Sequence, residues 1–324
     1  MTKKMTTLVR SALAVVAVCS SASGMAQSGE RVAVFTKNQT NPFFQAFRLG
    51  ADSAAKQMNA QVIHYVPTKP DSIPEQMSQV EDVIVKKPNA IVFTPVDYKA
   101  LVPAVAKMNA AKIPVVNATD RSESGQFVSF VGASDYKLGV ETGASLIKAL
   151  GGKGNLVIIE GVKGTQTNSD RIRGFTDAIK QAPGVKVVAT QPGNYQRLLA
   201  LQVMENLLQS HPQIDGVLAA NDAMAAGAIE ALQGANRKAL VVGINGTKEA
   251  IDAIKAGKML ATGDYNGFMQ GCVSVMTALR ELRKLPVQKE VIFPPVVIDK
   301  NNYQQWDVPV ESRSCPKWED AIKS

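Results

Sequence analysis

The sequence has few of the residues on which most enzymes and metalloproteins depend. Its 324 residues include only two histidines, His64 and His211, and three cysteines. The Cys-x-x-Cys, His-Glu-x-x-His and Gly-x-Ser-x-Gly patterns are absent from it, so the common zinc and serine-hydrolase motifs are missing. His64 falls in an expected strand and His211 at an expected helix end, and both are interpreted as structural. We therefore expect no catalytic residue, no metal and no cofactor.

Long apolar runs are also lacking. The one apolar stretch near the start, Leu13–Val18, follows three basic residues and precedes small residues up to Ala26. It is far shorter than the roughly 20 residues that span a bilayer, and the pattern is typical of a secretory signal peptide over 1–26, cleaved after Ala26. The alternative is a lipoprotein site at Cys19, which the bulky Val18 before it disfavours.

The charge balance excludes one class of partner. The formal net charge of +8 falls to +5 when the predicted signal peptide leaves, because that segment carries three basic and no acidic residues, Lys3, Lys4 and Arg10. The remaining surplus is spread along the chain without a basic cluster, so nucleic-acid binding is not expected. About 300 residues with ordinary apolar content are enough for two globular domains.

Two cysteines, Cys272 and Cys315, lie beyond the predicted signal peptide. An exported protein reaches an oxidising compartment that permits a disulfide between them. Two buried free thiols are the alternative. The distance between the side chains decides between these interpretations, and sequence alone leaves both open.

Short β-branched runs alternate with longer amphipathic stretches along the whole chain. In the first half the expected strands are 31–36, 61–66, 90–93, 113–117 and 127–131, and the expected helices are 41–58, 72–86 and 98–111. In the second half the strands are 155–159, 185–190, 216–219 and 240–244, and the helices are 135–150, 169–181, 195–210, 222–233, 248–256 and 268–285. Apolar runs without polar alternation suit parallel strands buried on both faces. The pattern predicts an α/β fold of two doubly wound parallel-sheet domains.

In doubly wound sheets, ligands bind beyond the carboxyl ends of the strands. The loops at those positions carry amides, carboxylates, guanidinium groups and aromatic rings, and they are 37–44, 94–97, 117–121, 161–171, 191–195, 221–222 and 245–246. Such groups pair with neighbouring hydroxyls and stack on the C–H faces of sugars and polyols. Asn and Asp after strands are also ordinary helix caps. Asp222 in particular is interpreted as a cap, and Phe43 and Phe44 could belong to the core.

Four motifs resemble one known family. Asn41-Pro42-Phe43-Phe44, the segment 164–175, the segment 221–225 and the segment 242–247 resemble the ribose-binding class of periplasmic sugar-binding proteins. The likeness runs in order over essentially the whole mature chain. It implies the type I periplasmic binding fold, a monomer with two similar domains joined by three crossovers, and a sugar clamped between them by hinge closure. It places the first domain at 31–133 plus 265–293 and the second at 134–264 plus 294–324.

The resemblance also suggests which residues contact the ligand. Thr94 stands where ribose binders have Asn and Asn245 where they usually have Asp, while Asn117 competes with the pair Asp120-Arg121 for one position. These differences favour another pentose, a hexose or a sugar alcohol over ribose. The predicted ligand-binding residues are Asn41, Phe43, Phe44, Thr94, Asn117, Asp120, Arg121, Arg171, Tyr195, Asn221, Asn245, Asp264 and Tyr265.

The expected protein is therefore a periplasmic component of an ABC importer. Its partners would be a small polyhydroxylated ligand and an inner-membrane ABC permease, and a chemoreceptor is a further partner that the fold allows. A receptor for a signalling molecule or chemoattractant on the same fold is the alternative function. The ligand-sensing domain of a transcription repressor is disfavoured, because the predicted signal peptide occupies the place of a helix-turn-helix. An enzyme is disfavoured because catalytic motifs are missing.

Overall fold

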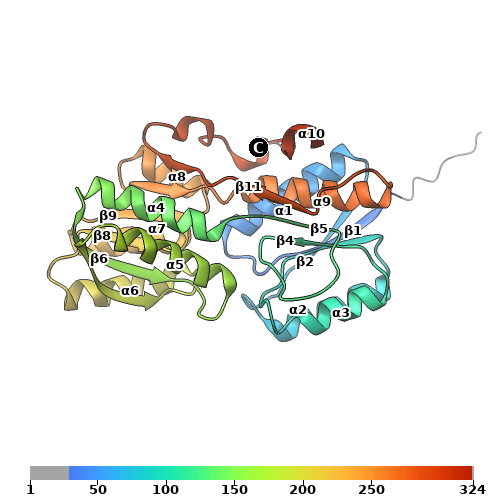
Figure 1. Ribbon diagram of the computed structural model, residues 1–324, viewed down its shortest axis with the longest axis horizontal. Coiled ribbons are helices and arrows are strands. Elements are labelled where there is room, and N and C mark those ends of the chain that lie inside the picture. Colours follow the sequence, from blue (N-terminus) through green and yellow to red (C-terminus); the bar gives the residue numbers. More distant parts are fainter. Residues whose placement is uncertain (1–28, 323–324) are drawn as a thin grey trace, which may run out of the picture.

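The structure, a computed structural model, describes residues 29–322, so the predicted signal peptide lies outside the described residues. Two six-stranded sheets form two lobes that lie side by side (Figure 1). The first sheet has the order β11-β5-β4-β3-β1-β2, with β1 Arg31–Phe35, β2 Gln61–Tyr65, β3 Ala90–Phe93, β4 Val115–Ala118, β5 Ser129–Ala133 and β11 Glu290–Phe293. The second has the order β12-β10-β9-β8-β6-β7, with β6 Lys153–Glu160, β7 Gly184–Pro192, β8 Gly216–Ala219, β9 Leu240–Ile244, β10 Ala261–Gly263 and β12 Val297–Asp299.

All strand pairs are parallel except that of β12 with β10. The helices accompanying the first sheet are α1 Pro42–Gln57, α2 Ile73–Lys86, α3 Val102–Ala110 and α9 Gly267–Leu282. Those accompanying the second are α4 Asp135–Ala149, α5 Gln166–Lys180, α6 Arg197–Ser210, α7 Asp222–Gly234 and α8 Lys248–Lys255. The predicted fold class, two doubly wound parallel sheets, is confirmed.

Strand β1 shows why these apolar runs become central strands. Val32 and Val34 belong to the apolar cluster that includes α1 and α9, whereas Ala33 and Phe35 belong to the cluster that includes α2 and α3. Successive side chains of a strand point to opposite faces, so a strand covered by helices on both sides needs an unbroken apolar run.

The sequence did not indicate three of the strands. β10 and β12 have only three residues each and β11 has four. They form late in the chain at or near sheet edges, where pairing with β9, β10 and β5 defines them. β5 also begins at Ser129, two residues later than the expected strand. Short strands depend on tertiary pairing more than on a local pattern.

Helix α9 returns to the first lobe and packs on α1 through two glycines. A Cβ on Gly50 would lie 2.0 Å from the carbonyl oxygen of Phe268, and one on Gly271 would lie 2.0 Å from that of Phe47. The backbones therefore approach more closely than any side chain would allow. This contact anchors the segment that enters α9, which contributes Tyr265 to the site described below.

The chain crosses between the sheets after β5, after β10 and after β11. A tail then follows, with short 3-10 turns η1 Tyr303–Gln305 and η2 Val310–Ser312 and the helical turn α10 Trp318–Ala321. η1 contacts α8 of the second lobe, whereas η2 contacts α1 and α10 contacts α9. The predicted domain ranges, 31–133 plus 265–293 and 134–264 plus 294–324, stay a prediction. They assign the whole tail to the second domain, whereas the tail contacts both lobes.

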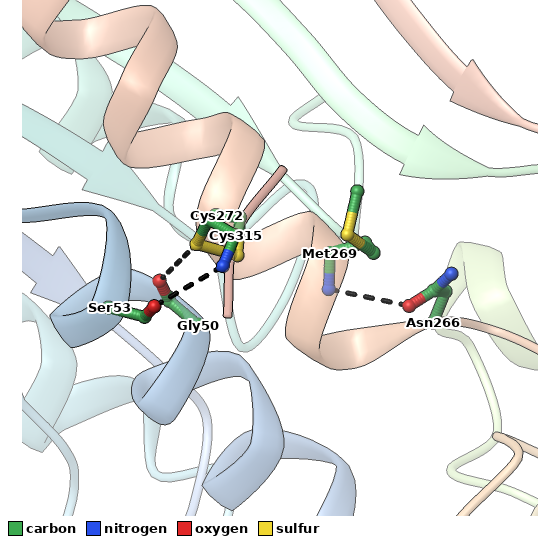
Figure 2. Close-up of a disulfide and its surroundings, with 6 residues drawn as sticks. All are labelled: Gly50, Ser53, Asn266, Met269, Cys272 and Cys315. Atoms are coloured by element: carbon green, nitrogen blue, oxygen red, sulfur yellow. Dashed lines mark hydrogen bonds between the residues drawn. A yellow bond between two sulfur atoms is a disulfide. The ribbon is translucent and has the colours of Figure 1, made fainter. Parts of the chain in front are cut away.

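A disulfide holds the tail on the first lobe. Cys272 of α9 and Cys315 are bonded, with their Cα atoms 5.7 Å apart. Figure 2 shows the bond beside Gly50 and Ser53 of α1, and the backbone N–H of Cys315 donates to the Ser53 hydroxyl at 3.3 Å. Of the two interpretations left open by the sequence, the structure contains the disulfide.

Within residues 29–322, no helix is both long and apolar enough to cross a membrane.

Candidate functional site

A cavity lies between the carboxyl ends of the two sheets and is lined from both lobes. Its walls come from the loops that follow β1, β2, β4, β7, β8 and β9, from the start of α1 and α5, and from the segment between β10 and α9. The lining residues are Lys37, Asn38, Asn41, Phe43, Phe44, Asp71, Thr119, Asp120, Thr167, Arg171, Tyr195, Asn221, Asn245 and Tyr265.

The first-lobe wall begins with the N-terminus of α1. Asn41 caps this helix, since its side-chain oxygen accepts from the Phe43 N–H at 3.0 Å, and Asn38 in turn accepts from the Asn41 N–H at 3.0 Å. Phe43 and Phe44 meet edge to face with ring centroids 5.1 Å apart, and Phe43 lies 5.1 Å from the ring of Tyr265. The cap fixes where α1 starts, and this start presents an aromatic surface to the cavity.

A buried ion pair occupies the opposite part of this wall. Lys37 Nζ lies 2.8 Å from Asp120 Oδ2, and the two side chains are 10% and 7% exposed. Asp71 is nearby and accepts from the Asn38 amide at 3.5 Å. Burial raises the pKa of Asp71, and the positive charge of Lys37 offsets only part of that effect.

The second-lobe wall is built around Arg171, which is 2% exposed. Its Nε donates to Asp135 at 2.8 Å and its Nη1 donates to the carbonyl of Ala220 at 2.6 Å and to Asn245 Oδ1 at 3.4 Å. The residue reaches this position because α4 and α5 pack closely: a Cβ on Gly139 would lie 2.4 Å from the Arg171 carbonyl oxygen.

Burial is the largest influence on the pKa values of Asp135 and Arg171. Burial raises the pKa of Asp135 to about 6, although the charge of Arg171 acts in the opposite direction. Burial would lower the pKa of Arg171, but Asp135 and the neighbouring Tyr195 and Tyr265 raise it overall. The arginine is therefore charged at any physiological pH. Since each cation of the cavity has a carboxylate partner, the cavity favours an uncharged ligand over an anion.

Aromatic rings flank the guanidinium group of Arg171. Its centre lies 4.6 Å from the ring of Tyr265 and 6.0 Å from that of Tyr195. Tyr195 has a left-handed backbone (φ 59°) and packs under Gly161, where a Cβ would lie 2.0 Å from the ring. Its hydroxyl is buried without a hydrogen-bond partner among the described residues, and burial raises its pKa.

Asn221 has two roles in this wall. It caps α7, because its side-chain oxygen accepts from the Met224 N–H at 2.9 Å, and its amide donates to the Tyr195 carbonyl at 3.4 Å. The interpretation of Asp222 as the cap is wrong: its carboxylate accepts from the Thr262 hydroxyl at 2.6 Å and from the Thr247 N–H at 2.8 Å. Burial raises the pKa of Asp222 to about 6.

Most of the predicted ligand-binding residues meet at this cavity. They are Asn41, Phe43, Phe44, Asp120, Arg171, Tyr195, Asn221, Asn245 and Tyr265. Neighbouring strand ends supply them because parallel strands present their carboxyl ends at one edge of each sheet.

Asn117 and Arg121 do not line the cavity, although Asp120 between them does. The Asn117 amide donates to the carbonyls of Phe93 at 3.1 Å and Asp120 at 2.7 Å, and so shapes the loop. Arg121 turns outward, pairs with Glu290 at 3.0 Å and is about half exposed.

Thr94 and Asp264 also lie elsewhere. Thr94 is fully buried after β3, and its hydroxyl has no hydrogen-bond partner in the described part of the chain. Asp264 accepts from the Trp306 indole N–H at 2.9 Å and the Asn266 N–H at 2.8 Å, and it lines an adjoining cavity of about 320 Å³. Burial raises the pKa of Asp264 to about 6.

Five further residues line the cavity and were not among the predicted ligand-binding residues. All of them follow strand ends or begin a helix, which is the only signal that could have found them. They are Lys37, Asn38, Asp71, Thr119 and Thr167.

Comparisons with known proteins show which family the chain resembles. The family profile for the periplasmic binding protein domain matches residues 32–285. The chain is 32% identical to the ribose import binding protein of Haemophilus influenzae, over 90% of this chain and 99% of that protein. It is 36% identical to the D-apiose import binding protein of Paraburkholderia graminis, over 74% and 77%. An ABC transporter periplasmic solute binding protein from Actinobacillus succinogenes with bound D-allose superimposes with a TM-score of 0.82 at 34% identity, covering 85% of this chain and 99% of that one.

Proposed function

Because the chain belongs to the periplasmic binding protein family, in its ribose-binding class, we propose that it captures a monosaccharide or sugar alcohol between its lobes and delivers it to an ABC importer. Members of this family are substrate-binding transport proteins, so the prediction that the chain is not an enzyme is confirmed. Its place is the periplasm, the compartment named for its family and for the D-allose-binding periplasmic protein among its relatives.

One observation carries the proposal. The cavity between the lobes combines an aromatic wall, Phe43, Phe44 and Tyr265, with amides and mutually neutralised ion pairs. Aromatic faces pack on the C–H surface of a sugar or polyol, while the amides and charged groups bond its hydroxyls. A hydrogen bond to a charged group contributes about 1.5–3 kcal/mol, so several together support tight binding after ordering costs are subtracted.

The ligand is proposed as a pentose other than ribose, a hexose or a polyol. Relatives carry names for different ligands, among them ribose, D-apiose, xylitol and D-allose, so identity alone does not select one. Asn245 supports a departure from ribose. Its oxygen accepts from Arg171, which leaves an amide donor where the ribose-binding class usually has a carboxylate acceptor. A site built to bond one hydroxyl rejects analogues that present the wrong partner.

Export and partners complete the proposal. Cleavage after Ala26 would release the mature chain, and mass spectrometry of protein recovered from the periplasm tests this site. An inner-membrane ABC permease would receive the closed, loaded form. A chemoreceptor partner, or a role as receptor for a signalling molecule, is the second candidate, since the same closed form could be recognised in either case.

A thermal-shift screen of the mature protein tests the function. The panel contains D-ribose, D-arabinose, D-allose, D-apiose, xylitol and myo-inositol, because a ligand that binds only the folded state raises the melting temperature. We expect at least one strong shift, and a smaller one for D-ribose. Calorimetry then gives the affinity, and recovery of the ligand unchanged separates binding from catalysis. Absence of a shift across the panel would refute the carbohydrate proposal.

A further inference from the structure

A hydrogen bond between two side chains joins the lobes across the cavity. The hydroxyl of Thr167, in the first turn of α5 in the second lobe, donates to Asp120 Oδ1 in the β4–β5 loop of the first lobe. The other carboxylate oxygen, Asp120 Oδ2, lies 2.8 Å from Lys37 Nζ. Each oxygen of Asp120 therefore has its own partner, one from each lobe.

Both ends of this bond are buried and held by their surroundings. Thr167 is 8% and Asp120 7% exposed. The Asn117 amide fixes the loop by donating to the Asp120 carbonyl, and Thr165, two residues before Thr167, caps α5. A hydrogen bond to a carboxylate is stronger when it is shielded from water, and little rearrangement is needed to form this one.

The hydrogen bond between Thr167 and Asp120 also lies between two spaces in the protein. Thr119, Asp120 and Thr167 line the cavity between the lobes, and the same residues line a second space of about 350 Å³ that continues along α4 and α5. The contact between Asp120 and Thr167 thus separates the site from this second space. Parting the two lobes at this point would join the two spaces.

We propose that Thr167 and Asp120 form a latch that closes the ligand cavity and sets the rate at which the ligand leaves. This inference rests on the proposed function. In the open form Asp120 keeps Lys37 as its partner and water replaces the Thr167 hydroxyl, so the bond stabilises only the closed form. Thr167 is a positioning residue that acts through Asp120.

Another polar contact between the lobes is made by Tyr265, and it lies in a different part of the fold. The Tyr265 hydroxyl lies 3.1 Å from the Thr119 carbonyl oxygen and 3.0 Å from Asp135 Oδ2. Tyr265 belongs to a crossover segment, and hinge segments absorb a closure motion while the lobes travel. The latch residues both belong to the lobes and separate on opening.

The test is Thr167→Val, which removes the hydroxyl and keeps the shape. Thr176→Val is the matched control, because Thr176 is exposed on the same helix and its hydroxyl donates only to the Ile172 carbonyl among the described contacts. Thr167→Ser restores the donor. The probe is whichever of D-ribose, D-arabinose, D-allose, D-apiose, xylitol and myo-inositol gives the largest thermal shift with the wild type.

With Thr167→Val we expect the ligand dissociation rate to rise about tenfold or more, as loss of a charge-assisted hydrogen bond implies. The association rate should stay near wild type, and Thr167→Ser should recover slow release. The latch is overturned if Thr167→Val changes the dissociation rate less than twofold, or if Thr176→Val raises that rate as much as Thr167→Val does. In either case, ligand binding by the wild type still upholds the proposed function.

A ligand-independent measurement covers the case in which no probe binds and the proposed function fails. Spin labels at Val85→Cys on α2 and Leu198→Cys on α6, which are 79% and 67% exposed, report the distance between the lobes. The Thr167→Val change should lower the closed fraction of the unliganded protein severalfold. An unchanged distance distribution would contradict the latch.

Discussion

Arg171 and Asp135 form an ion pair at the wall of the cavity, with Nε and Oδ1 2.8 Å apart and side chains 2% and 11% exposed. The pair links α5 to α4, and Tyr265 from the crossover segment completes it through its hydroxyl. One side chain is therefore both a proposed ligand contact and part of the structure that holds the second lobe together. Its two roles can be separated by experiment.

Arg171→Ala should weaken ligand binding about tenfold or more. It should also lower the free energy of unfolding by about 3–5 kcal/mol, because Asp135 is left buried without its partner. The double variant Arg171→Ala, Asp135→Asn should regain much of the stability without regaining affinity. Calorimetry and urea unfolding measure the two effects. Affinity within twofold of wild type in the single variant would mean that Arg171 does not contact the ligand.

Asn221→Ala should weaken binding by a similar factor and cost about 1 kcal/mol of stability through loss of the α7 cap. Asn221→Ser keeps a capping oxygen and removes the amide donor. We expect it to unfold at nearly the wild-type urea concentration while binding stays weak. If the serine variant binds as tightly as the wild type, the amide of Asn221 acts only on the helix.

The stability of the ligand-free protein should fall as the pH rises from about 4 to about 6. Burial raises the pKa of Asp135, Asp222 and Asp264 to about 6, above the ordinary value of about 3.9. In this window the folded state binds more protons than the unfolded state, and stability then decreases with pH.

Urea unfolding at a series of pH values measures that slope. Asp222→Asn should make it shallower, because one of the three groups no longer titrates. Carboxyls with lowered pKa values, such as Asp177 and Asp307, make stability rise with pH, but they do so mainly below pH 4. A slope that Asp222→Asn leaves unchanged would show that this carboxyl is ionised in the folded protein.

Removing the disulfide with Cys272→Ser and Cys315→Ser should cost about 4 kcal/mol, the chain-entropy value for a loop of this size, since the cysteines are 43 residues apart. The tail after Trp306 should become more sensitive to protease, because the bond ties it to α9. Urea unfolding and limited proteolysis measure both effects. Reaction of unreduced, unfolded wild-type protein with a thiol reagent would instead support two free thiols.

The strand–helix order was predictable because it follows from local patterns. Runs such as Val32–Phe35 are apolar without alternation, and they became central strands covered on both faces. The late strands β10, β11 and β12 lack such a run. β11 and β12 form because the chain crosses back and pairs with β5 and β10, and the three residues of β10 pair with both β9 and β12.

The candidate site was predictable at the level of loops and less so at the level of side chains. Asn117 in β4 and Asp120 in the loop after it are three residues apart, yet Asp120 lines the cavity and Asn117 bonds the backbone that supports it. Asp264 and Tyr265 are adjacent, yet Asp264 pairs with Trp306 of the tail while Tyr265 enters the cavity. Loop side chains have no periodicity from which direction can be read.

The sequence by itself determined the two-sheet α/β class, the strand ends that carry the site and the family resemblance, because each depends on residue types in chain order. Tertiary structure decided which side chains share the cavity, the pairing of Cys272 with Cys315, and the meeting of Thr167 with Asp120. These relationships depend on distances between residues far apart in the chain, which the packing of α1 on α9 and of α4 on α5 establishes.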